Sequence, residues 1–267
     1  MNDSRKWWIL SVTSLGSLLS ALNFSTLIIA LPDLLKGLQA SLLQAMWVML
    51  SYMVAQTVMV LMAGSLADRF GRKRIYVGGM LLFTVVSLIA GFAGSAPLLI
   101  VLRILQGVGG AMIMANSTAI VADAFPKEEL GRALGVNIMV VAVGQIIGPV
   151  LGGWLTESFG WEWNFWFNVP FGLVGVVWGL KVLGLKDDKL AAPKSGGLDR
   201  GGAAAYVLSI TGLLIALTWG PIQSWTSPVV WISALVFVLL FPAFLRCEQR
   251  HPNALLHLPL FANRTFS

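Results

Sequence analysis

The chain has 267 residues and a net charge of +6; 57% of its residues are hydrophobic and only 11% are charged. Soluble domains carry about 25% charged residues, so this composition excludes a soluble globular protein. The single cysteine, Cys247, excludes a disulfide framework, and with only two histidines in the chain we expect no metal site and no cofactor.

Eight continuous apolar runs follow one another along the chain. Each run is roughly 17 to 25 residues long, near the length that crosses a hydrocarbon core of ~30 Å. In outer-membrane barrels polar and apolar residues alternate instead, so continuous runs exclude that fold. We therefore predict an all-α polytopic membrane protein with helices at residues 7–31, 45–66, 75–93, 98–122, 133–155, 163–185, 203–219 and 229–245.

Positive residues lie almost entirely on one side of these helices. Of the 18 Lys and Arg residues, 16 fall in the N-terminal end, in alternate loops and in the C-terminal tail. The opposite loops hold only Lys36, and Arg103 lies within a predicted helix. Because positive residues concentrate in cytoplasmic loops, we expect a multi-pass protein of the cell membrane with both ends of this chain in the cytoplasm. The charge therefore indicates membrane topology and not nucleic-acid binding.

A long polar segment separates the first six predicted helices from the last two. It contains Lys, Asp, Pro, Gly and Ser, a composition typical of a flexible linker. We predict a six-helix domain at 1–185, a cytoplasmic linker at 186–202, a two-helix hairpin at 203–246 and a tail at 247–267.

Asn23 of the first predicted helix and Arg103 of the fourth are expected at a similar depth in the membrane. Asn23 and Arg103 are expected roughly 12 and 9 Å below the outer surface, from ~1.5 Å of helix rise per residue. The amide oxygen of Asn23 can then accept a hydrogen bond from the guanidinium. Because this partner is neutral, we expect the charge of Arg103 to be available to an anionic or electron-rich ligand.

The loop GSLADRFGRKR at 64–74 is the strongest local signal. We expect Gly71 to supply a backbone angle that other residues avoid, and Asp68 to cap a helix or to pair with Arg72. A positive turn that only sets the topology is the alternative. We interpret the loop as a conformational switch formed by Gly64, Asp68, Arg69, Gly71 and Arg72.

The fourth predicted helix contains LRILQGVGGA at 102–111. An arginine inside a membrane span is costly and marks a functional site by default; structural pinning by helix-end carbonyls is the alternative. Gly107 and Met114 follow on the Arg103 face, where they are expected to form a narrow groove. The candidate substrate cavity comprises Asn23, Thr26, Gln56, Arg103, Gln106, Asn137 and Gln145, with Met114 for adaptable apolar contacts.

The fifth predicted helix carries a stripe of glycines. Gly144, Gly148 and Gly152 are spaced by one helical turn and predict close packing against another helix. Pro149 removes one backbone hydrogen bond, so the same stretch is also a candidate pivot. Gly107 of the fourth helix is assigned to packing for the same reason.

These three stretches resemble signatures of the major facilitator superfamily. The 64–74 loop resembles G-x-L-A-D-R-x-G-R-K, and 102–111 is similar to the element R-x-x-Q-G-x-G-x-A. The stretch GQIIGPVLGG at 144–153 resembles G-x-x-x-G-P-x-x-G-G of the antiporter branches. Three further stretches resemble the fourteen-helix drug:proton antiporter branch of this superfamily. They are LIIALP at 27–32, WEWNFWFNVPFG at 161–172 and LFANRTFS at 260–267.

The resemblance implies the N-terminal six-helix bundle and linking hairpin of a secondary active efflux transporter. Such a multidrug or amphipathic-metabolite exporter exchanges a small substrate for protons across the lipid bilayer, with a C-terminal half that this chain lacks, and it is not an enzyme. Family members often carry an acid where this chain has Asn23 and an arginine where it has Glu162. No acid is predicted at mid-membrane depth, so the coupling residue is not visible in this part. A nutrient importer of the same fold and a non-transporting assembly or regulatory fragment are the alternatives.

Overall fold

The computed structural model describes residues 3–184, 200–222 and 224–250. The chain divides into two compact units, Met1–Leu190 and Ala191–Ser267. Within the described ranges every regular element is a helix, which confirms the predicted all-α fold. Most of the predicted linker and tail lies outside the described residues, so the finer domain boundaries stay a prediction.

Eight helical segments in the described ranges are long and apolar enough to cross a membrane. α6 and α7 together form one of these segments, Trp163–Val182. Several helices extend beyond the predicted apolar runs, and α5 continues through Pro149; the predicted pivot there stays a prediction. The helices are α1 (Asp3–Gly37), α2 (Leu42–Phe70), α3 (Arg72–Ala90), α4 (Ala96–Ala124), α5 (Lys127–Phe159), α6 (Trp163–Trp166), α7 (Asn168–Val182), α8 (Arg200–Ile222) and α9 (Pro228–Arg250).

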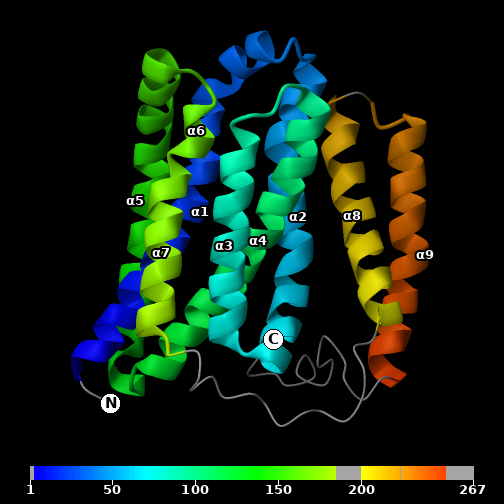
Figure 1. The fold of residues 1–267 in the computed structure, drawn as a ribbon. Coiled ribbons are helices and arrows are strands. Elements are labelled where there is room, and N and C mark those ends of the chain that lie inside the picture. Colours follow the sequence, from blue (N-terminus) through cyan, green and yellow to red (C-terminus); the bar gives the residue numbers. More distant parts are fainter. Residues whose placement is uncertain (1–2, 185–199, 223, 251–267) are drawn as a thin grey trace. The chain divides into compact units, whose positions relative to one another are not determined.

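In the first unit α4 lies between α2 and α3 (Figure 1). It packs against α1, α2 and α3, while α1 also packs against α5 and α7. Between α3 and α4 the backbones approach closely, since a methyl group added at Gly79 would lie 2.9 Å from the carbonyl oxygen of Gly109. In a bilayer, van der Waals packing of this kind holds helices together, because lipid tails are as apolar as the helices themselves.

Two large clusters of buried apolar side chains fill most of the first unit, and a smaller third one lies around Phe125. One joins α1, α3 and α4 through residues such as Val12, Tyr76, Met80 and Ile113. The other lies around Leu99 and connects α1, α2, α3, α4 and α6. Arg103 occupies the interior beside these clusters as a fully buried side chain.

The turn between α2 and α3 depends on a glycine. Gly71 has φ +97°, and its N–H donates to the carbonyl oxygen of Ala67 over 2.9 Å. Residues with a Cβ rarely adopt this backbone conformation, so the expectation for Gly71 is confirmed. The turn lies at the same end of the first unit as the beginning of α1 (Figure 1).

The second unit contains α8 packed against α9. The helices come close at Gly212, where an added methyl group would lie 2.7 Å from the carbonyl oxygen of Ser233. Tyr206 and Phe244 pack with ring centres 5.3 Å apart. The two helices therefore form a hairpin with its own contact surface.

Candidate functional site

Arg103 of α4 is bonded to two neighbouring helices through neutral acceptors. Its Nη1 donates to Asn23 Oδ1 of α1 and, over 2.7 Å, to Gln106 Oε1. Its Nε donates over 3.0 Å to the backbone carbonyl of Val48 on α2. The predicted contact between Asn23 and Arg103 is confirmed.

The network continues from Gln106 to α3. Gln106 Nε2 donates to Ser87 Oγ over 2.7 Å, and Ser87 Oγ donates to the carbonyl oxygen of Phe83 over 2.7 Å. The guanidinium carbon lies 4.3 Å from the centre of the Tyr52 ring and 5.9 Å from that of Phe165. Such cation–π contacts stabilise a guanidinium that has lost its water.

The burial of this network corrects the expectation that the Arg103 face of α4 lines a groove open to a ligand. Arg103 and Gln106 are fully buried, and Asn23 is only 1% exposed. A methyl group added at Gly107 would lie 2.6 Å from the backbone oxygen of Tyr52. This face of α4 therefore packs against α2 instead of lining the expected groove, and a bulky ligand does not reach the guanidinium in this conformation.

Gln56 and Met114 belong to a second polar group. Gln56 Nε2 donates to Ser20 Oγ over 3.1 Å and lies 3.9 Å from Met114 Sδ. Ser20 Oγ is also 2.8 Å from the hydroxyl oxygen of Tyr52, whose ring lies against Arg103. Met114 is 59% exposed and Gln56 is partly exposed. These two predicted cavity residues therefore lie at the surface of the first unit.

Asn137 and Gln145 share no hydrogen bond with either group in the described part of the chain. Asn137 is buried, and its Nδ2 donates over 3.1 Å to Ser117 Oγ. Ser117 Oγ is 3.2 Å from Ser17 Oγ, so these residues join α5, α4 and α1. Gln145 is exposed on α5. The eight predicted cavity residues are thus divided among several places in the first unit.

The glycine stripe of α5 faces α1. A methyl group added at Gly152 would overlap the backbone of Thr26, and one added at Gly148 would overlap the side chain of Ser25. Ser25 Oγ also donates over 3.3 Å to the carbonyl oxygen of Gly144. The stripe therefore packs as its spacing predicts, and Thr26, assigned to the cavity by the sequence, is buried at this helix contact.

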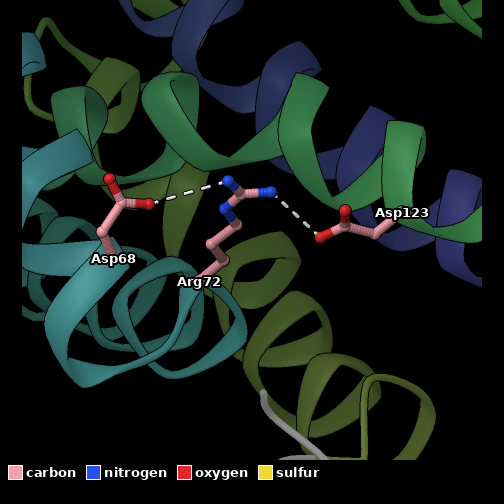
Figure 2. Close-up of polar contacts among 3 residues, drawn as sticks. All are labelled: Asp68, Arg72 and Asp123. Atoms are coloured by element: carbon pink, nitrogen blue, oxygen red, sulfur yellow. Dashed lines mark hydrogen bonds and ion pairs between the residues drawn. The ribbon is translucent and has the colours of Figure 1, made fainter. Parts of the chain in front are cut away.

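At the end of the bundle with the α2–α3 turn, the guanidinium of Arg72 lies between two carboxylates (Figure 2). Its Nη1 is 3.1 Å from Asp123 Oδ2 of α4, and its Nη2 is 3.6 Å from Asp68 Oδ1 of α2. The predicted pairing of Asp68 with Arg72 is confirmed. All three side chains are at least 40% exposed, and exposed pairs contribute only about 0.2–1 kcal/mol each. The connection is therefore weak enough to break when helices move.

The other two residues of the predicted switch loop make fewer contacts. The guanidinium carbon of Arg69 lies 5.9 Å from the centre of the Phe70 ring. A methyl group added at Gly64 would meet nothing within 4 Å. The role of Gly64 in the loop therefore has no packing explanation in the first unit.

Several residues of these groups were not among the candidates predicted from the sequence, and Asp123, Tyr52 and Ser20 are examples. Asp123 is one residue beyond the predicted fourth helix, and Tyr52 is one helical turn before Gln56. Ser20 is three residues before Asn23. Helical spacing placed Tyr52 and Ser20 beside a candidate residue but did not show which helix they face, and no spacing connects Asp123 with Arg72, which lies on another helix.

The polar groups consist mainly of amides, hydroxyls and guanidinium groups. In the part of the chain that the structure describes, no group of three or more His, Cys, Asp or Glu side chains is placed to hold a metal ion. The arrangement offers hydrogen bonds and apolar surface to a ligand.

Comparisons with known proteins agree with this architecture. Residues 13–266 match the family model of the Major Facilitator Superfamily. The chain is 33% identical to the riboflavin transporter RibZ of Clostridioides difficile, over 98% of this chain and 56% of that protein. It is 32% identical to the multidrug export protein EmrB of Haemophilus influenzae, over 95% of this chain and 49% of that protein.

Another relative is the tetracenomycin C resistance and export protein of Streptomyces glaucescens, which is 33% identical over 96% of this chain and 47% of that protein. The chain spans about half the length of the curated relatives it matches. A crystal structure of a peptide transporter POT in complex with sulfate superimposes with a TM-score of 0.66 over 93% of this chain and 53% of that chain, at 19% identity. This similarity concerns the fold alone. The chain is a multi-pass membrane protein and belongs to the major facilitator superfamily.

Proposed function

We propose that this chain is the N-terminal part of a secondary active efflux transporter of the cell membrane, which exports drugs or amphipathic metabolites in exchange for protons. The observation that supports the proposal best is the match along nearly the whole chain to two proteins named for export. EmrB covers 95% of this chain and the tetracenomycin C export protein covers 96%. The direction of transport and the coupling ion are part of the proposal.

The second polar group supports a binding surface on the first unit. Gln56 offers an amide, and Met114 offers a flexible, polarisable side chain that adapts to ligands of different shape. In secondary transporters the substrate lies between two repeats that rock against each other. We propose that the six-helix domain 1–185 supplies one wall of this site, and that the half of the relatives' length not matched here supplies the other.

Proton coupling rests on the family resemblance. Asn23 bonds Arg103 where a carboxylate is common in the family, and an amide does not exchange a proton. We propose that the proton-binding residue belongs to the other half of the transporter.

Reconstituted vesicles containing the protein from its full reading frame test this function. We expect saturable transport of amphipathic compounds that depends on a proton gradient and stops when a protonophore is added. The panel contains cationic, neutral and anionic compounds of similar size. A transport rate that does not depend on the proton gradient would contradict antiport. Net movement of the compounds in the direction of uptake would contradict efflux.

Riboflavin is included in the same panel because of RibZ. That relative is named as a riboflavin transporter and is 33% identical to this chain, which keeps a nutrient transporter of the same fold as the second candidate. Gradient-dependent uptake of riboflavin, with no export of the amphipathic compounds, would favour this candidate.

A further inference from the structure

Four buried polar groups around Arg103 have hydrogen-bonding capacity that no described residue meets. They are Nη2 of Arg103, Nδ2 of Asn23, Oγ1 of Thr26 and Oγ of Ser51. Each of these residues is at most 3% exposed. Buried polar groups in folded proteins nearly always have a partner, so four such groups in one region require an explanation.

One printed contact and the helical spacing place the four groups around the same guanidinium. Asn23 is bonded directly to Arg103, and Thr26 lies one turn further along the same face of α1. Ser51 lies one turn after Val48, whose carbonyl oxygen accepts from Arg103 Nε. The unmet capacity is therefore concentrated where α1 and α2 meet α4.

These groups are suited to a negative ligand. Arg103 Nη2 and Asn23 Nδ2 can only donate hydrogen bonds, and the hydroxyls of Thr26 and Ser51 can donate as well. The acceptors that contact the guanidinium, Asn23 Oδ1, Gln106 Oε1 and the Val48 carbonyl oxygen, are already bonded to it. Two further buried amide oxygens without a partner among the described residues, Asn164 Oδ1 and Asn168 Oδ1, belong to α6 and α7 and not to the helices that bond Arg103.

The charge at this place is also uncompensated by protein. The guanidinium keeps its proton at any ordinary pH, and its three hydrogen-bond partners are neutral. Burying a charge is costly unless an opposite charge or strong hydrogen bonds accompany it. The Tyr52 ring, 4.3 Å away, covers one face of the guanidinium and leaves the Nη2 edge to another group.

We propose that Arg103 Nη2, Asn23 Nδ2 and the hydroxyls of Thr26 and Ser51 bind a compact monovalent anion of halide size. The complete burial of Arg103 excludes a bulky substrate from this place in the present conformation. The bound anion neutralises the guanidinium within the helix bundle and completes the bonds of all four groups. This site is independent of the proposed export function.

A halide titration of the purified protein tests the proposal. The protein is melted at constant ionic strength while gluconate is replaced by chloride or bromide through the millimolar range. We expect the melting temperature to rise saturably, on the order of 3 °C, because a ligand that binds only the folded state stabilises it. Identical melting in gluconate and in both halides would overturn the proposal and would indicate that buried water completes the bonds.

An internal carboxylate locates the effect. Asn23→Asp places a fixed negative charge beside the guanidinium, so we expect the halide response to disappear while the melting temperature without halide rises. Gln56→Glu is the matched control, because it makes the same change in an amide that is bonded to Ser20 and not to Arg103. A full halide response in Asn23→Asp would overturn the proposal.

Bromide also provides a measurement that needs no variant. In crystals of the protein grown with bromide, we expect an anomalous peak within hydrogen-bond distance of Arg103 Nη2. Peaks only elsewhere on the protein, with none at this position, would overturn the proposal even if the melting temperature responds to halide.

Discussion

At the scale of single residues, Arg103 determines how the helices of the first unit meet. Its side chain bonds α1 and α2 directly and reaches α3 through Gln106 and Ser87. The sequence presented Arg103 either as a ligand-binding charge or as a structural pin. Its complete burial favours the structural pin as far as bulky ligands are concerned. The guanidinium can affect such ligands only through the residues that surround it.

Arg103→Ala is expected to lower the free energy of unfolding by about 3–5 kcal/mol, because it leaves buried acceptors on α1, α2 and α4 without their donor. Denaturant or thermal unfolding of the purified protein measures this loss. Arg132→Ala is the control: Arg132 is exposed and lies 5.6 Å from the Trp7 ring, so a loss of about 1 kcal/mol or less is expected. Equal losses in the two variants would contradict the central role of Arg103.

Gln56→Ala and Met114→Ala are expected to change the preference among transported compounds, because these side chains are the reachable members of the second polar group. The half-saturating concentration for preferred compounds should rise about tenfold if one hydrogen bond or a good apolar contact is lost. Transport by the full-length protein in vesicles measures the effect. The matched control is Leu105→Ala, an exposed position on the opposite face of α4 from Met114. A similar change in the control would indicate a general effect on the helix.

At the scale of elements, α5 combines a packed face with an open one. Its glycine stripe contacts α1, whereas large side chains such as Ile146, Val150 and Trp154 are more than half exposed. Because glycine has no side chain, the stripe allows the backbones of α1 and α5 to approach closely. Van der Waals contact between the backbones then holds the two helices together.

Gly152→Ala is expected to destabilise the α1–α5 contact by about 1–3 kcal/mol, since the new methyl group would overlap the backbone of Thr26, which cannot rotate away. Gly135→Ala on the same helix meets nothing within 4 Å and should raise the stability by about 0.5–1 kcal/mol through better helix propensity. Melting curves of the two variants provide the comparison. A stable Gly152→Ala protein would show that α1 and α5 shift apart without cost.

The Arg72 pairs connect α2, α3 and α4 at one end of the bundle (Figure 2). Asp123→Asn is expected to leave the melting temperature nearly unchanged, because these side chains are exposed. A loss of about 1 kcal/mol in one conformation of the transporter would still shift the balance between conformations roughly fivefold. The transport rate should therefore fall more than the stability does.

Transport and melting are measured together for this variant. Glu157→Gln serves as the control, since Glu157 is an exposed acid in the last turn of α5, at the other end of the bundle. If both variants reduce transport equally, the switch role of the Arg72 pairs is wrong.

At the scale of the whole molecule, the charge map makes a prediction that the fold does not test. Single cysteines at Lys127 and Ser158, two exposed positions near opposite ends of α5, are placed in a Cys247→Ser background. A membrane-impermeant maleimide should label Ser158→Cys in intact cells and Lys127→Cys only after permeabilisation. The reverse pattern would mean that the bundle is inserted in the opposite orientation.

Length and hydropathy were sufficient to predict the eight membrane-length segments, because a helix must cross a core of ~30 Å with its backbone bonds satisfied internally. The residues at which the helices begin and end were less predictable. α1 spans Asp3–Gly37 and α5 spans Lys127–Phe159, both beyond their apolar runs, since helical hydrogen bonds continue into polar surroundings. The break between α6 and α7 falls at Phe167, three residues before Pro170. Proline lacks the N–H that would continue the helical bonds from α6, but the apolar run across this stretch was predicted as one helix.

Sequence spacing alone determined which residues share a face of a helix, and so it placed Gly107 on the Arg103 face and brought Gly144, Gly148 and Gly152 into one stripe. Only the tertiary structure decided which helix each face meets: Tyr52 fills the space beside Gly107, Ser25 and Thr26 meet the stripe, and Asp123 completes the Arg72 pairs. The physical reason is that helical periodicity is a local property of the backbone, whereas burial depends on the neighbour. For Arg103 the sequence determined the charge and its position within an apolar helix, and the packing of α1, α2 and α3 against α4 decided that this charge is buried among neutral partners.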